Sequence, residues 1–130
     1  MKYLMTIVWA IICISCMQGN NRQTVKGNSL TQENYPHHPT AVYYSKHARC
    51  RMDCRHITDE DIRATLANGY LNEKKSNLSL DDCHKRYAIE YKLTTQNIRV
   101  IAAFCNNTAT IITCIDLGRD WECHCPGDTH

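Results

Sequence analysis

The sequence has no apolar run long enough to cross a membrane, no large excess of charge of either sign and no internal repeat. Its 15 Lys and Arg stand against 13 Asp and Glu, which gives a formal net charge of +2 over 130 residues. This balance gives no reason to expect a nucleic acid or an anionic surface as a partner. The length indicates a single folded domain.

The N-terminus carries a short apolar stretch, residues 3–16, which follows Lys2 and precedes a polar sequence. A membrane-spanning helix needs about 20 apolar residues, so this stretch is typical of a secretory signal peptide. Ile14-Ser15-Cys16 resembles the cleavage site of bacterial lipoproteins, in which the cysteine becomes lipidated. We expect residues 1–16 to be a lipoprotein signal and Cys16 to anchor an exported chain, membrane-bound or periplasmic, in the cell envelope. Plain secretion and a retained anchor are the alternatives.

Large apolar side chains are almost missing from residues 17–41, which are rich in Asn, Gln, Ser, Thr and Pro. Such a segment cannot bury enough apolar surface to offset the entropy that ordering would cost. We therefore expect a flexible polar tether, followed by a folded domain over residues 42–125. Residues 126–130 are expected to form a frayed tail.

Cysteine, in contrast, is abundant, with nine in the chain. If Cys13 leaves with the signal and Cys16 is lipidated, seven remain: Cys50, Cys54, Cys83, Cys105, Cys114, Cys123 and Cys125. Disulfides persist in an exported protein. Because seven is odd, at least one thiol must be free, metal-bound or paired to another chain.

Two helices are predicted at the start of the folded domain. Ser45 is a suitable N-cap for a helix that continues through Cys54. Thr58 begins a second helix, with Asp61 as its capping-box partner. Gly69 is expected to end that helix in the left-handed conformation.

Alternating and β-branched patterns predict strands at residues 70–74, 84–92, 98–104 and 109–117. The last two are close in sequence and should form an antiparallel hairpin at the centre of the sheet. Residues 41–44 form either a short strand or the approach to the first helix. The predicted fold is α+β, with two N-terminal helices packed on a three- to four-stranded antiparallel sheet.

The first predicted helix carries an unusual set of side chains, HARCRMDCRH at residues 47–56. At about 100° per residue, Lys46, Arg49 and Asp53 fall on one side, which should face water. His47 and Arg51 lie on the opposite arc and should face the sheet. We interpret that face as a polar network that joins helix to sheet, with cysteines that pack or crosslink.

A buried arginine is costly unless it is paired. Arg51 therefore needs a partner, and Glu90 or Asp116 is the natural candidate. Near the C-terminus, Trp121 is expected to anchor the tail on the core and not to act as a ligand platform.

Zinc is an alternative for the cysteine-rich face. Cys50 and Cys54 share a helix face at spacing i, i+4, and the sequence Cys123-His124-Cys125 supplies further soft ligands. Together they could provide the tetrahedral set of four ligands that zinc prefers. The spacing matches no standard zinc finger or ribbon.

Several segments in order resemble the bacterial domain of unknown function family 4258, in the cysteine-rich form found in Bacteroides-like bacteria. They are YSKHARCRM (44–52), RHI (55–57), YAIE (87–90), IRVI (98–101) and TCIDL (113–117). The family name assigns no activity. A more distant likeness of fold connects such domains with RelE-like and barnase-like ribonuclease toxins, and fold alone does not imply function.

That likeness suggests a catalytic hypothesis. RNA cleavage through the 2′-hydroxyl needs a base, an acid and a cation, for which the candidates are His47, Arg51, Arg55, His84 and Arg99. The cysteine content is unusual for a small nuclease, and an exported, tethered protein does not meet its own cell's RNA. A cysteine nucleophile beside His47 or His84 is a further alternative.

We therefore expect an exported, lipid-anchored, cysteine-rich domain with a structural or interaction role and zinc as its candidate cofactor. It would contact the membrane through Cys16, and the sequence names no protein partner. Nucleic acid is not an expected partner. A ribonuclease-like toxin domain is the alternative.

Overall fold

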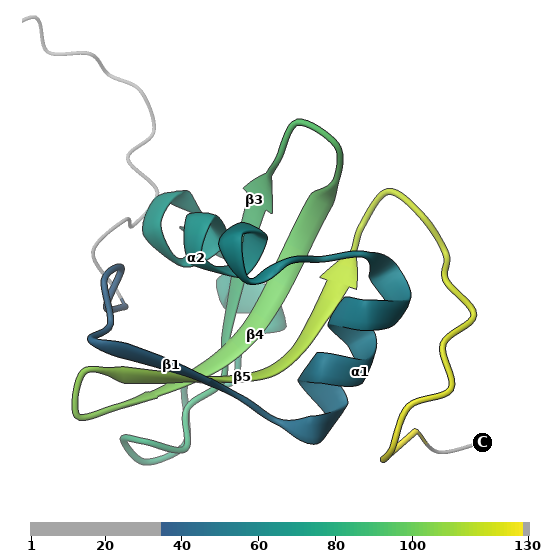
Figure 1. The fold of residues 1–130 in the computed structure, drawn as a ribbon. Helices are drawn as coiled ribbons and strands as arrows, with labels where there is room; N and C mark the ends of the chain where they lie inside the picture. Colours follow the sequence, from purple (N-terminus) through teal and green to yellow (C-terminus); the bar gives the residue numbers. More distant parts are fainter. Residues whose placement is uncertain (1–34, 129–130) are drawn as a thin grey trace, which may run out of the picture.

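The computed structural model describes residues 35–128 (Figure 1). The expected signal peptide, Cys16 and the first part of the expected tether lie outside these residues. The elements in chain order are β1 (Ala41–Tyr44), α1 (Lys46–Arg55), α2 (Asp59–Asn68), β2 (Tyr70–Leu71), the short 3-10 helix η1 (Glu73–Lys75), β3 (Tyr87–Lys92), β4 (Asn97–Cys105) and β5 (Thr108–Asp116).

The fold is α+β, but its sheet has five strands in the order β1-β5-β4-β3-β2 and is mixed. The prediction of three or four antiparallel strands was wrong at β1, which pairs with β5 in parallel. A four-residue strand carries little alternation, and its partner lies more than 60 residues away. The β4–β5 hairpin is confirmed, and Asn106 and Asn107 form its turn with φ of 47° and 58°. Asn tolerates this left-handed region better than most residues.

Both helices begin where their capping residues predict. The Ser45 hydroxyl accepts a hydrogen bond from the Ala48 amide at 3.0 Å. Thr58 and Asp61 form the complete capping box of α2. Such caps satisfy amide groups that the first helical turn leaves without partners.

Gly69 ends α2, but not in the predicted left-handed conformation, since its φ is −75°. Its role is to allow a close approach of the helix end to β3. A β-carbon there would lie 2.4 Å from the Thr65 carbonyl oxygen and 2.9 Å from that of Glu90. Only glycine fits between these two backbones.

The two helices cover the same face of the sheet (Figure 1), α1 over β5 and α2 over β3 and β4. The core lies between these layers, where Ile62 and Leu66 of α2 meet Ile89 and Val100 of the sheet, all with at most 1% exposure. Full burial of each such side chain is worth about 1.5–3 kcal/mol. The core therefore fixes α2 over the sheet, and the buried Ala48 and Met52 do the same for α1.

The packed structure begins before residue 42. Tyr35, within the expected tether, is only 6% exposed, and its hydroxyl donates to the carbonyls of Leu66 and Gly69 at 3.1 and 3.0 Å. Its ring stacks on Phe104. One tyrosine thus attaches the end of a polar segment to the domain.

No helix within residues 35–128 is both long and apolar enough to span a bilayer.

Candidate functional site

Six cysteines form three disulfides. Two of them, Cys50–Cys125 and Cys54–Cys123, join α1 to residues 117–128, which we call the C-terminal segment. This segment has no helix or strand and runs along the outer side of α1 (Figure 1). The third, Cys83–Cys105, joins the loop before β3 to the end of β4. The disulfide alternative thus accounts for six of the seven candidate cysteines.

The disulfides disfavour the zinc hypothesis for these four cysteines. The four sulfurs that it needed are bonded to one another in pairs and have no thiolate to offer a metal. Within the described part of the chain, no group of three or more His, Cys, Asp or Glu side chains could hold a metal ion. Spacing along the helix cannot distinguish metal binding from disulfide formation. Two cysteines at i, i+4 can bind one metal ion together, or each can form a disulfide with a cysteine of a neighbouring segment.

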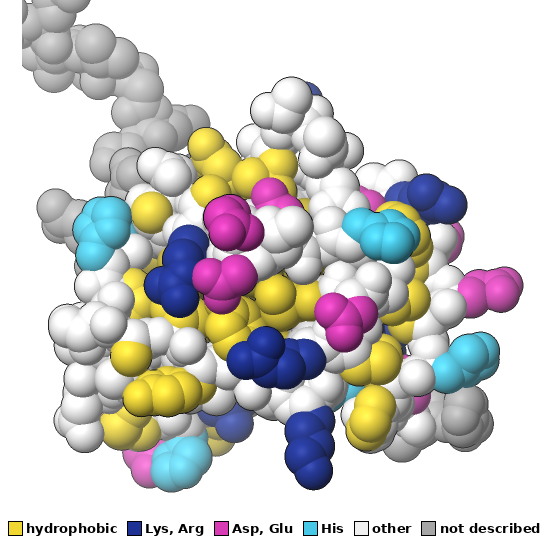
Figure 2. All heavy atoms as spheres, viewed as in Figure 1, with side chains coloured by type: hydrophobic (Ala, Val, Ile, Leu, Met, Phe, Trp, Pro, Cys, Tyr) yellow, Lys and Arg dark blue, Asp and Glu magenta, His cyan; other side chains and the backbone are white. Residues whose placement is uncertain are grey.

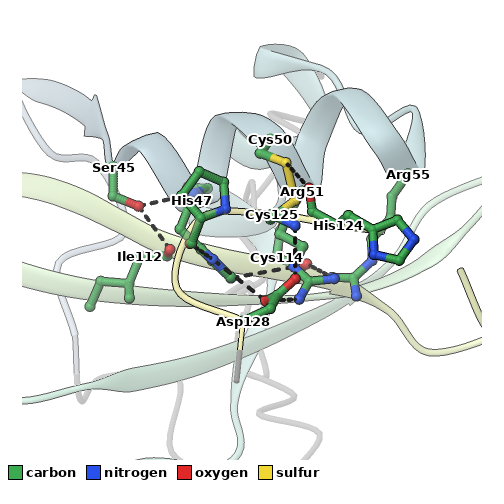
Figure 3. A network of polar contacts seen from close by, with 12 residues as sticks. Ser45, His47, Cys50, Arg51, Arg55, Ile112, Cys114, His124, Cys125 and Asp128 are labelled. Atoms are coloured by element: carbon green, nitrogen blue, oxygen red, sulfur yellow. Dashed lines mark hydrogen bonds and ion pairs between the residues drawn. A yellow bond between two sulfur atoms is a disulfide. The ribbon is translucent and has the colours of Figure 1, made fainter. Parts of the chain in front are cut away.

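The exposed side of α1 is as predicted, but on the covered side His47 and Arg51 contact the C-terminal segment, where the prediction placed them against the sheet. Lys46, Arg49 and Asp53 are exposed, Ala48 and Met52 are buried, and His47, Arg51 and Arg55 are partly covered. Figure 3 shows His47, Arg51 and Asp128 converging between α1 and the C-terminal segment. We call these three residues the α1 network.

Each side chain of the α1 network is held by the others or by the backbone. Arg51 forms an ion pair with Asp128, and its Nε donates to Nε2 of His47 at 3.3 Å. The other ring nitrogen of His47 lies 2.8 Å from the Pro126 carbonyl oxygen. The Cys125 amide donates to Asp128 at 2.8 Å. This hydrogen bond, together with the charge of Arg51, holds the pKa of Asp128 below its usual value.

Asp128 replaces both partners that the sequence suggested for Arg51, Glu90 and Asp116. It lies in the expected frayed tail, and the disulfide at Cys125 brings it beside α1. Sequence reasoning overlooked it because nothing local signals a contact over 77 residues.

The two acidic residues expected near Arg51 have other partners. Glu90 accepts hydrogen bonds from Tyr70, Asn72 and Arg99 at 2.6–2.8 Å. Burial alone would raise the pKa of Glu90, but these hydrogen bonds outweigh it and lower the pKa. Asp116 accepts from the Gly118 amide at 2.9 Å and from Trp121 Nε1 at 3.0 Å.

Arg55 closes the open edge of β5. The pairing of β1 with β5 ends at Ile111, and beyond it the Arg55 guanidinium donates to the Cys114 carbonyl. Such an unpaired strand edge is otherwise a site for unwanted pairing. Burial, followed by the charge of Arg51, lowers the pKa of Arg55. In the described structure the Arg55 side chain thus covers part of the β5 edge.

Cys114 is the one described cysteine outside a disulfide, and it is fully buried. Burial raises the pKa of its thiol to about 11. A nucleophilic cysteine needs a thiolate and access to substrate. Cys114 therefore packs as a small apolar residue, which disfavours the cysteine-nucleophile alternative.

Only three of the five candidate catalytic residues come together. His47, Arg51 and Arg55 share α1, whereas His84 is exposed on the loop before β3, 3.0 Å from Asp81. Arg99 alternates along β4 with the buried Ile98 and Val100 and so lies on the face of the sheet away from the helices. A shared active centre for all five is excluded by this arrangement.

A cleft of about 510 Å³ opens where α1 ends. We call it the Trp121 cleft. It is lined by His56, residues 92–97 of the β3–β4 turn, Asp116, Gly118, Arg119 and Trp121. Sequence reasoning identified Trp121 only as an anchor, which its hydrogen bond to Asp116 confirms. The cleft joins three distant segments, so no local pattern could have predicted it.

Comparison with known proteins gives one family. Residues 44–116 match the family described as Domain of unknown function (DUF4258), which confirms the resemblance seen in the sequence. No curated protein and no solved structure matches the chain. The matched residues run from the end of β1 to the end of β5 and exclude the C-terminal segment. Because the match covers more than half of the chain, the protein belongs to the DUF4258 family.

Proposed function

We propose that the protein is an exported, lipid-anchored domain that acts by interaction and not by catalysis. The main support is the set of three disulfides, two of which join the C-terminal segment to α1. Such bonds persist in oxidising compartments and are rare in the cytosol. They agree with the signal-like N-terminus and the Cys16 cleavage motif.

The α1 network supports a structural role for the residues that looked catalytic. A general base needs a free ring nitrogen within reach of substrate, and both nitrogens of His47 are engaged. A cation for a developing phosphate charge should be free to turn toward it, yet Arg51 is neutralised by Asp128. These contacts attach the C-terminal segment to the helix.

The surface supports the same proposal. Figure 2 shows acidic and basic side chains interspersed on the face that carries both helices. Proteins that bind nucleic acid concentrate Lys and Arg on one face. The mixed charge of this face suits a protein or small-molecule partner better than RNA.

A ribonuclease-like toxin domain is the second candidate, and the gathering of His47, Arg51 and Arg55 on one helix favours it. It requires the α1 network to open when substrate binds. The C-terminal segment would have to move away from His47 and Arg51, against two disulfides.

Lipid attachment is tested by metabolic labelling with palmitate. The wild type should incorporate label and Cys16→Ala should not, because the thiol at position 16 is the acceptor. Cys13→Ala is the matched control and should be labelled like the wild type. Equal labelling of Cys16→Ala, or a mature N-terminus at another residue, would remove the lipoprotein proposal.

Catalysis is tested with RNA. The purified, oxidised protein should leave single-stranded and structured RNA intact, and its expression in a cytoplasm without residues 1–16 should not slow growth. A toxin would stop growth, and His47→Ala would relieve the arrest while remaining folded by circular dichroism. The control His84→Ala should change nothing in either case. Relief by His47→Ala alone would establish the ribonuclease alternative.

A further inference from the structure

We propose that the Trp121 cleft binds a small organic anion, a ligand with a carboxylate or phosphate group on a compact apolar body. The proposal rests on the proposed interaction role and names the class of ligand. The residues of the cleft lie outside the α1 network. The volume of the cleft, about 510 Å³, lies within the range of small-molecule sites, roughly 300–1,000 Å³.

The charge of the cleft is the first reason. Lys92 and Arg119 line it, against one carboxylate, Asp116. Asp116 is only 9% exposed and already accepts hydrogen bonds from Gly118 and Trp121. Within the described residues, neither Lys92 nor Arg119 has a carboxylate within ion-pair distance. The cleft therefore presents two cations that a bound anion could pair with.

The second reason is the fixed position of Trp121. Its indole N–H is held by Asp116. The Arg119 guanidinium lies over the ring at 4.2 Å from the centroid, and the His56 ring meets it edge-on at 5.5 Å. An aromatic wall bordered by a guanidinium suits a ligand that carries an apolar body next to an anion.

Both walls of the cleft are held by contacts within the protein. The Leu93 amide donates to the Gln96 carbonyl at 2.8 Å and closes the β3–β4 turn, while the Gln96 side chain donates to the Arg55 carbonyl at 2.8 Å. On the other side, Cys54–Cys123 holds the segment that carries Trp121. A site formed in advance loses less conformational entropy on binding.

The test uses the fluorescence of Trp121. The chain has two tryptophans, Trp121 and Trp9, and Trp9 lies in the proposed signal. In the chain with Trp9→Phe, the fluorescence reports the cleft alone whether or not the signal is removed. Benzoate and phenyl phosphate are the anionic probes, and benzamide is the neutral control. At least one anion should change the fluorescence saturably with a Kd of about 1 mM or tighter. The preferred anion then distinguishes a carboxylate ligand from a phosphate ligand.

Substitutions locate the binding. Arg119→Gln should weaken the bound probe roughly tenfold, because hydrogen bonds to charged groups are worth that much or more. Arg119→Lys should keep most of the affinity, and Lys92→Gln should weaken it. The matched controls are Lys74→Gln and Arg49→Gln, exposed cations away from the cleft, which should leave the Kd unchanged.

The proposal is overturned by any of three results: no saturable signal with either anion up to about 10 mM, equal affinity for benzamide, or an unchanged Kd in Arg119→Gln. Circular dichroism of each variant establishes that it is folded. The result is independent of the lipid proposal, because Cys16→Ala should bind the probe like the wild type. If neither anion binds but palmitate labelling is normal, the proposed ligand class is contradicted and the lipid-anchor proposal stands.

Discussion

Removing Cys50–Cys125 and Cys54–Cys123 together should lower the free energy of unfolding by about 6 kcal/mol, whereas removing either alone should cost only about 2 kcal/mol. The two bonds are nested, with sequence separations of 75 and 69 residues. Either one by itself closes the same long loop in the unfolded chain, which is worth about 4 kcal/mol. The second bond then closes only the small ring formed by residues 50–54 and 123–125.

Urea unfolding of four proteins measures this effect: the wild type, Cys50→Ser/Cys125→Ser, Cys54→Ser/Cys123→Ser, and the variant with all four changes. The control is Cys83→Ser/Cys105→Ser, whose separate 22-residue loop should cost about 3 kcal/mol. Losses that add between the two double variants would contradict the nested arrangement. Since domains are stable by about 5–15 kcal/mol, a loss of this size would unfold the fourfold variant if the wild type lies at the lower end of that range.

Arg51→Ala should lower the free energy of unfolding by about 2 kcal/mol, and Arg49→Ala by less than about 1 kcal/mol. Both residues lie on α1, but Arg51 is 16% exposed and binds Asp128 and His47, whereas Arg49 is exposed and lies over Tyr44. Matched urea melts of the two variants decide the comparison. Equal midpoints would show that the α1 network contributes nothing to stability.

The stability lost in Arg51→Ala should depend on pH. The pKa of Asp128 is lowered in the folded protein, chiefly by the Cys125 amide and then by Arg51. A carboxylate with a lowered pKa contributes stability above its ordinary pKa, and that contribution is lost as the pH falls through the lowered value. The wild type and Arg51→Ala should therefore differ most near neutral pH and converge as the pH falls through the lowered pKa of Asp128. A constant difference across this range would exclude Asp128 as the partner that matters.

Both stability predictions concern the attachment of the C-terminal segment, and that attachment bears on the proposed ligand site. Trp121 and Arg119 belong to this segment, two residues or more before Cys123. Release of both disulfides should free them from the β3–β4 turn and abolish probe binding.

Local features were predictable from the sequence because their physical cause is local. Ser45 and Thr58 cap helices through amides three residues away. The β4–β5 hairpin follows from two β-branched runs joined by Asn106 and Asn107. The inward face of α1 follows from helical geometry alone, and the odd cysteine count required one thiol outside the disulfides among the seven, which is Cys114.

The remaining features were decided by the tertiary structure. The partner of Cys50 lies 75 residues away, and that of Arg51 lies 77 residues away. A single sequence cannot show which distant cysteine pairs with Cys50 or which carboxylate pairs with Arg51, because the chain offers many chemically equivalent candidates. The parallel pairing of β1 and the Trp121 cleft also depend on where distant segments meet after folding. Local patterns thus predicted both helices, their N-caps, the β4–β5 hairpin and the family. The packed core selected the distant partners, since only it fixes which distant groups lie within bonding distance.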